Sequence, residues 1–187
     1  MTKNENQAEG APPTAYPTRI PPQDQSGGPG LDSKTTPGAH WTQLEYWTND
    51  GKPYLKEYEG RGLLQDKAVL ITGGDSGIGR SVAILMAREG ADVTIMYLPE
   101  EQEDADYTIE AIQKAGRKGH GIKGDLKEEA FCKSAIEEHL KVHGGRLNVL
   151  VNNCEFAALI ASRDVADQSS QHPCKKSATI IKTSTWR

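Results

Sequence analysis

The sequence predicts an α/β fold in which the strands of a parallel sheet alternate with helices. Three observations support this prediction. Short apolar runs such as 67–72 are typical of strands that are buried on both faces of a sheet. Apolar residues recur at helical spacing between these runs, and glycines follow the helical stretches at positions 90, 116 and 144. The regular alternation of the two patterns favours right-handed βαβ units.

Each element is predicted from its own pattern. Strands are expected at 67–72, 91–97, 120–124 and 147–151, where β-branched and apolar residues dominate. Helices are expected between them, with these apolar faces: Ile78, Val82, Leu85 and Met86 in the first, Ala105, Thr108, Ile109 and Ile112 in the second, and Cys132, Ala135, Ile136 and Leu140 in the third. After residue 153 only 178–181 has the pattern of a strand.

Composition divides the 187 residues into three segments. Residues 1–60 hold eight of the ten prolines and seven of the nineteen glycines, so we expect an N-terminal arm whose first ~40 residues are extended or disordered. The aromatic stretch from Trp41 to Tyr58 predicts that this part of the arm lies against its own domain or a neighbouring subunit, because aromatic side chains gain from burial. Residues 61–153 form the βαβ domain, and residues 154–187 are an atypical tail with one possible strand.

Charge and cysteine content exclude several classes of function. The formal net charge is −4, so no basic surface is expected for nucleic acid or for an anionic membrane. No apolar run reaches the ~18 residues of a membrane-spanning helix, and residues 1–10 lack the pattern of a secretory signal. Three widely spaced cysteines, Cys132, Cys154 and Cys174, argue against a disulfide framework and favour a cytoplasmic protein.

The most informative motif is Thr72-Gly73-Gly74-Asp75-Ser76-Gly77-Ile78-Gly79, which leaves the first strand and opens the first helix. Gly73 permits a sharp turn. Gly77 and Gly79 let the backbone approach a pyrophosphate and let the helix pack tightly on the strand. The helix N-terminus supplies N–H groups and the positive end of its dipole. A glycine turn in this context predicts a Rossmann-type, doubly wound domain that binds NAD or NADP.

This turn and the motifs that follow it resemble those of the short-chain dehydrogenase/reductase family, and in particular its glucose/ribitol dehydrogenase-like, general-stress type members. The resemblance spans about residues 19–153 and extends to Gly124-Asp125-Leu126 and Val151-Asn152-Asn153. It implies an NAD(P)-dependent oxidoreductase that acts on a sugar, polyol or carbonyl substrate, and a homotetramer. It also implies the cofactor-binding residues: Thr72, Gly73, Ser76, Gly77, Ile78 and Gly79 at the pyrophosphate, Asp125 and Leu126 beside the adenine, and Asn152, which ties the fourth strand to the cofactor wall.

The resemblance ends after Asn153. Where the family reads Asn-Asn-Ala-Gly, this chain continues with Cys154-Glu155, which places a charged side chain beside the expected nicotinamide ribose. Residues 177–185 are similar to the family's fifth strand, with Thr185 in the slot of the catalytic serine and Ser184 before it. The family's Tyr-x-x-x-Lys pair does not follow.

We therefore predict no catalytic residue in this chain and a sheet that is incomplete on its C-terminal side, which counts against a defined tetramer. A catalytically inactive NAD(P)-binding fragment, or an interaction protein, is the alternative to an active oxidoreductase. General acid catalysis is worth about 10²–10⁴-fold in rate, so a chain without its acid should be a poor catalyst.

Two local questions stay open in the sequence. Arg80 is either a cation that serves the 2′-phosphate of NADP or an exposed helix residue, and Glu100 and Glu101 come slightly late for the acid that bonds the 2′-hydroxyl of NAD. His139 and His143 have a spacing that suits a metal, but no third ligand is near. We interpret them as cationic residues at a helix C-terminus and predict no metal site.

Overall fold

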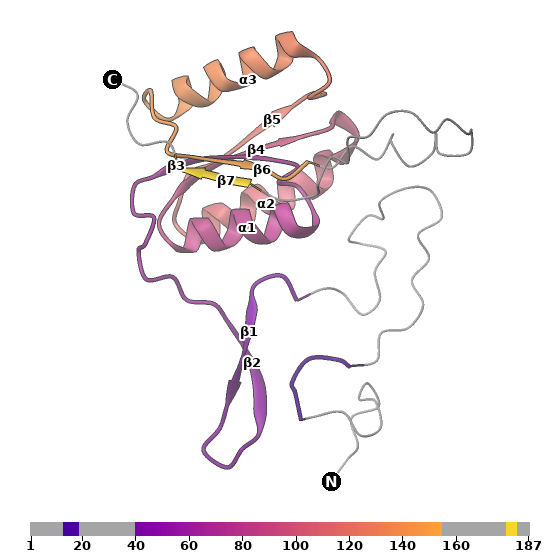
Figure 1. Ribbon diagram of the computed structural model, residues 1–187, viewed down its shortest axis with the longest axis vertical. Coiled ribbons are helices and arrows are strands. Elements are labelled where there is room, and N and C mark those ends of the chain that lie inside the picture. Colours follow the sequence, from indigo (N-terminus) through magenta and orange to yellow (C-terminus); the bar gives the residue numbers. More distant parts are fainter. Residues whose placement is uncertain (1–12, 19–39, 155–178, 183–187) are drawn as a thin grey trace, which may run out of the picture. The chain divides into compact units, whose positions relative to one another are not determined.

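The computed structural model describes residues 13–18, 40–154 and 179–182. The chain divides into two compact units, Met1–Glu59 and Gly60–Arg187 (Figure 1). The first unit contains an antiparallel hairpin of β1 (Gln43–Trp47) and β2 (Pro53–Glu57). The second unit contains a five-stranded sheet with the order β5-β4-β3-β6-β7.

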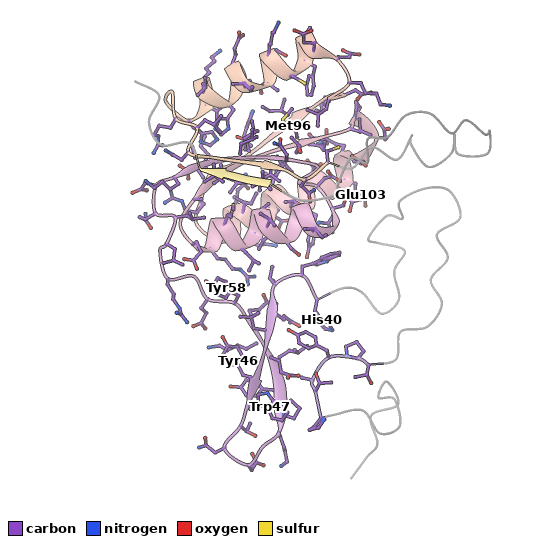
Figure 2. All side chains as sticks on the ribbon, viewed as in Figure 1. His40, Tyr46, Trp47, Tyr58, Met96 and Glu103 are labelled. Carbon is purple, nitrogen blue, oxygen red and sulfur yellow. The ribbon has the colours of Figure 1, made fainter. Side chains whose placement is uncertain are left out.

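The hairpin was missed by the sequence analysis, although Asp50-Gly51 between two aromatic runs is a strong hairpin signal. Tyr46 and Tyr54 are opposite each other in the register, with ring centroids 5.9 Å apart. Tyr46 and Trp47 stay exposed on this unit (Figure 2). The expectation that the aromatic stretch lies against another surface stays a prediction.

The second unit confirms the predicted α/β fold. Four of its strands are parallel: β3 (Ala68–Thr72), β4 (Asp92–Tyr97), β5 (Gly119–Lys123) and β6 (Val149–Asn152). The helices are α1 (Gly77–Arg88), α2 (Gln102–Lys114), which follows the short 3-10 helix η2 (Pro99–Glu101), and α3 (Glu129–Val142). Helices α1 and α2 cover one face of the sheet and α3 covers the other (Figure 1). In the described ranges, no helix has the length and apolar character that crossing a bilayer requires.

The last strand, β7 (Thr179–Lys182), pairs with β6 in the antiparallel direction, with Asn152 opposite Thr179. The sequence analysis placed a strand here, at 178–181, without giving its direction. A parallel neighbour needs a crossover to the opposite end of the sheet, whereas an antiparallel one does not. The connection 155–178 lies outside the described residues, as do Ser184 and Thr185.

Alternate strand residues form two apolar cores. One core, against α1 and α2, includes Val69, Ile71, Val93 and Ile95. The other, against α3, is formed by Leu70, Met96, Ile122 and Ala135, and Figure 2 shows Met96 on that side of the sheet. All five residues of β3 are buried, as expected for a central strand that is covered on both faces.

The buried face of α1 differs from the predicted one. Gly79, Ala83 and Ala87 are buried, whereas Ile78 is 72% exposed. Val82 and Met86, two of the four predicted residues, are partly buried against the core, so the prediction is wrong at Ile78 and incomplete for the small residues that face the sheet. Two residues that were predicted on the apolar face of α3 are not buried there: Ile136 is exposed and Cys132 is only half-buried.

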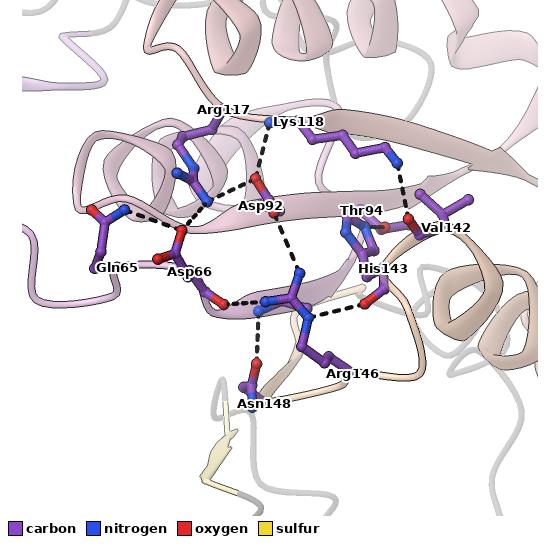
Figure 3. Close-up of polar contacts among 11 residues, drawn as sticks. Gln65, Asp66, Asp92, Thr94, Arg117, Lys118, Val142, His143, Arg146 and Asn148 are labelled. Carbon is purple, nitrogen blue, oxygen red and sulfur yellow. Dashed lines mark hydrogen bonds and ion pairs between the residues drawn. The ribbon is translucent and has the colours of Figure 1, made fainter.

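Charged side chains tie together the strand starts at the base of the sheet (Figure 3). The Asp92 carboxylate, at the start of β4, accepts a hydrogen bond from the backbone N–H of Lys118 and lies 3.0 Å from Arg117. Arg146, just before β6, donates to the carbonyl oxygens of Asp66 and His143 at 2.7 and 3.0 Å. These contacts link the residues that precede β3, β4 and β6 at the base of the sheet.

The two histidines of α3 are not a cationic helix terminus. His139 and His143 are 0% and 2% exposed. The Thr94 hydroxyl oxygen on β4 lies 2.9 Å from His139 Nδ1 and 2.8 Å from His143 Nε2, so it can donate to one ring and accept from the other. This arrangement suits two neutral imidazoles, because a buried charge without a counterion is costly. The cationic interpretation is therefore wrong.

The neutral histidines make stability depend on pH. Burial, and then the nearby His143, lowers the pKa of His139 from 6.5 to about 4. The unfolded chain consequently binds more protons than the folded chain between these two values, and the free energy of unfolding must fall as the pH falls through this window. We expect the urea midpoint to decrease from pH 7 to pH 4.5, and His139→Gln to flatten this dependence. His40→Gln, at an exposed histidine of the first unit, should not. An unchanged slope in His139→Gln would contradict the assignment.

Candidate functional site

The predicted site residues lie where parallel strands end at a common edge of the sheet. Thr72 ends β3, and the turn to Gly79 follows it. Asp125 and Leu126 come after β5, and Asn152 ends β6. Ligands of open α/β sheets bind outside the carboxyl ends of the strands. The topology therefore brings the sequence-predicted residues to one edge.

The glycine turn has a shape that side chains would prevent. Gly73 and Gly77 have φ angles of +62° and +53°. A Cβ on Gly79 would lie 1.8 Å from the carbonyl oxygen of Gly73, and one on Gly74 would lie 2.5 Å from Ile95. A Cβ on Gly77 would meet nothing within 4 Å. The turn is thus closely packed on its inner side and open at Gly77.

The turn is fixed by residues that follow β6. The Thr72 hydroxyl accepts hydrogen bonds from the backbone N–H groups of Asn153 and Cys154, at 2.9 and 3.0 Å. The Asn153 amide donates to the carbonyl oxygens of Thr72 and Gly73, at 3.2 and 2.9 Å. These contacts come from Asn153, which the sequence analysis did not single out. Asn152 is exposed at the end of β6, and its expected role at the cofactor wall stays a prediction.

The start of α1 is suited to an anion. Ser76 has an extended backbone and makes no side-chain capping hydrogen bond, and the first turn contains no acidic residue. Helix N-termini present N–H groups and the positive end of the dipole. Ile78 projects from this turn with 72% of its surface exposed, which leaves an apolar side chain beside the open position at Gly77.

Arg80 has neither of the roles that the sequence left open for it. It is 4% exposed, and its Nε donates to the Asp75 carbonyl at 2.8 Å and to the Thr108 hydroxyl at 3.1 Å. Its guanidinium also forms an ion pair of 2.5 Å with Asp104 on α2. Thr108 donates to the same Asp75 carbonyl at 3.0 Å. Arg80 therefore fastens the glycine turn to α2 and is already matched by a carboxylate.

Several carboxylates lie around this edge. Burial raises the pKa of Asp75 and of Glu101. Partial burial raises the pKa of the Cys154 thiol, and Glu101, Asp75 and Asp125 raise it further. Asp75 follows β3, Glu101 ends η2 after β4 and Asp125 follows β5, so each acid comes shortly after the end of a parallel strand. The Asp125 carboxylate accepts a hydrogen bond from the backbone N–H of Lys127 at 2.9 Å.

Other candidate ligands do not assemble into a metal site. In the part of the chain that the structure covers, no group of three or more His, Cys, Asp or Glu is placed to hold a metal ion. Cys132 and Cys154 are free thiols. Cys174 and Glu155 are not among the described residues, so the charge expected beside the nicotinamide stays a prediction.

Comparisons with known proteins identify relatives. The family model described as short chain dehydrogenase matches residues 67–181. The chain is 43% identical over 138 residues to general stress protein 39 of Bacillus subtilis (strain 168), with 74% of this chain and 43% of that protein covered. It is 35% identical over 140 residues to the glucose and ribitol dehydrogenase of Daucus carota, with 72% of this chain and 44% of that protein covered.

A solved structure, of a short chain dehydrogenase from Burkholderia cenocepacia J2315 in complex with NADP, is 35% identical and covers 50% of this chain and 37% of its own, with a TM-score of 0.48. This chain spans less than half the length of these three relatives.

A double-mutant cycle can measure the link between Arg80 and Asp104. Arg80→Met leaves Asp104 without its counterion in a site where the two side chains are 5% and 17% exposed. We expect a loss of about 3 kcal/mol in the free energy of unfolding and a coupling of at least ~1 kcal/mol with Asp104→Leu. The exposed pair Lys114–Glu110 on α2 is the matched control and should couple by only about 0.5 kcal/mol. Equal coupling in the two pairs would show that Arg80 does not fasten the turn.

Proposed function

Because this chain belongs to the short-chain dehydrogenase family, we propose that its glycine turn binds the pyrophosphate of NAD or NADP. We further propose that the protein is an oxidoreductase that acts on a sugar, polyol or carbonyl substrate. Family membership supports the reaction type, and the substrate class follows from the resemblance to glucose and ribitol dehydrogenases.

The shape of the turn is the observation that supports binding. The backbone at Gly77 is open, since a Cβ at this position would meet no atom within 4 Å, whereas Gly73 and Gly79 are packed against each other. A pyrophosphate can approach the first turn of α1 only if the inner side of the glycine turn is firmly packed and its outer side carries no side chain. No capping side chain from Ser76 occupies that turn.

The remaining predicted residues would complete the site. Asp125 and Leu126, after β5, would lie beside the adenine, and Leu126 is partly buried against the core that faces α3. Ile78 would cover the cofactor with its exposed side chain. Asn152, exposed at the end of β6, would face the nicotinamide half. A bound nicotinamide would supply hydride transfer, and this chain's own part would be to hold and orient it.

A second candidate function is nucleotide binding without catalysis. Cys154-Glu155 stands where the family reads Ala-Gly beside the expected nicotinamide ribose, and this departure favours it. Binding and turnover separate the two candidates. Oxidation of a polyol panel by the purified chain with either cofactor would support the oxidoreductase, whereas cofactor binding with no turnover above buffer would support the second candidate. Turnover that survives Ser184→Ala and Thr185→Ala would reveal an acid or base that the sequence analysis did not recognise.

Replacing Gly77 tests the binding proposal. Gly77→Val places a branched side chain on the open side of the turn, and we expect NAD(P) affinity to fall at least ~100-fold in calorimetry, an energy of about 3 kcal/mol. Gly116→Val is the matched control, since Gly116 also has positive φ and open space around a Cβ but lies after α2. Both variants should lose similar stability from backbone strain. Equal affinities of wild-type protein and Gly77→Val would refute the site.

A further inference from the structure

The hairpin of β1 and β2 has one aromatic face that is open. In an antiparallel pair, residues opposite each other in the register project from the same face, and neighbours along a strand project from opposite faces. One face therefore carries Tyr46 (Figure 2), Tyr54 and Leu44, which are 39%, 43% and 44% exposed. We call these three residues the tyrosine face. No layer covers it in the part of this unit that the structure describes.

The opposite face of the hairpin already holds a segment of the N-terminal arm. The Glu45 carboxylate accepts hydrogen bonds from the Thr14 hydroxyl and from the backbone N–H of Ala15, each at 2.5 Å. The Tyr16 hydroxyl donates to a backbone carbonyl of β1 at 2.8 Å. Two of the six residues in 13–18 are proline. The hairpin thus binds one proline-containing segment of its own chain.

The tyrosine face is suited to a second segment of this kind. An isolated two-stranded hairpin is at best marginally stable in water, and each tyrosine gains from burial of its ring as long as its hydroxyl finds a partner. A polyproline II segment offers both contacts, because it has apolar pyrrolidine rings and carbonyls without internal hydrogen bonds. Proline cannot donate to a strand edge, so such a segment packs on a face and does not extend the sheet.

The chain between residue 18 and β1 has both the sequence and the position to supply this segment. The connection 19–39, outside the described residues, begins directly after the segment that contains Tyr16 and returns to His40. The His40 ring lies edge-on to Tyr16, with centroids 6.0 Å apart, and its Nδ1 lies 2.7 Å from the Gln43 side-chain oxygen. Both ends of the connection are therefore held beside β1.

The adjacent prolines of this connection are within reach of the tyrosine face. Pro22 comes six positions after Tyr16, and six residues can span about 20 Å. A five-residue strand such as β1 is about 17 Å long. A short tether also keeps the segment at a local concentration of about 1 mM, so even weak contacts suffice to hold it.

We propose that the tyrosine face binds the Ile20-Pro21-Pro22 segment of the same chain. The pyrrolidine rings pack on the two tyrosine rings, and the tyrosine hydroxyls donate to carbonyls of the segment. The hairpin then carries proline-containing segments of its own arm on both faces. This interaction belongs to the first unit alone and is independent of the dinucleotide site proposed above.

Hydroxyl-radical footprinting of the full chain tests the proposal, because it measures the solvent access of each tyrosine. The variant Pro21→Gly/Pro22→Gly removes the rings and the fixed φ angles. We expect the two tyrosines of the tyrosine face to be oxidised at least ~3-fold faster in this variant than in the wild type, since their rings lose their cover. Pro29→Gly, at a single proline of the same connection, is the matched control and should leave both rates unchanged.

A peptide with the sequence of residues 18–25 gives a second readout by NMR titration. It should bind the double-glycine variant at least ~10-fold more tightly than the wild type, whose own tethered segment competes. Adding Tyr46→Ala to that variant should abolish binding. Tyr107→Ala should not, because Tyr107 is an exposed tyrosine of α2 in the second unit.

Three outcomes overturn the proposal. Equal oxidation of the two tyrosines in the wild type and the double-glycine variant would show that the segment does not cover them. Protection that appears only when the protein concentration rises from about 1 µM to about 100 µM would assign the face to a second copy of the chain. Peptide binding that survives Tyr46→Ala would place the proline segment on another surface.

Discussion

The geometry of the candidate site depends on the contact between the glycine turn and the residues after β6. The Thr72 hydroxyl receives two backbone N–H groups from Asn153 and Cys154, and the Asn153 amide spans two carbonyls of the turn. The turn also requires Gly79, because any Cβ there would overlap the Gly73 carbonyl. Hydrogen bonds that share partners in this way reinforce one another. The shape of the turn therefore depends on the residues after β6 as well as on its glycines.

The two ends of the sheet have different roles. At the base, the charges are matched: Asp92 lies near Arg117 and Arg146, and Arg146 also donates to two backbone carbonyls. At the carboxyl edge, Asp75, Glu101 and Asp125 follow three of the parallel strands, and Arg80 is paired with Asp104 of α2. Paired charges hold neighbouring strands together. Backbone groups and charged side chains that are not fully paired can instead interact with a ligand. This asymmetry agrees with the family membership of the chain and with ligand binding at the carboxyl edge.

The strands and helices of the second unit could be predicted because each is specified locally, by an apolar run or by a helical period. The errors concern residues whose surroundings come from distant segments. Arg80 was judged without Asp104, and His139 without its burial against β4, where Thr94, 45 positions away, contacts its ring. The contact of Asn153 with the Gly73 carbonyl joins residues 80 positions apart, which local composition does not reveal.

The central claim is that the carboxyl edge, closed by the Thr72–Asn153 contact, is a dinucleotide site. Hydrogen–deuterium exchange of the full chain, with and without saturating NAD⁺, tests it most directly because it reports each backbone segment separately. We predict slower exchange in 72–80, 98–102 and 152–154 when NAD⁺ is present, and no change around 142–148 at the base of the sheet. Protection at the base alone, or no protection in 72–80 under conditions where NAD⁺ binds, would contradict the claim.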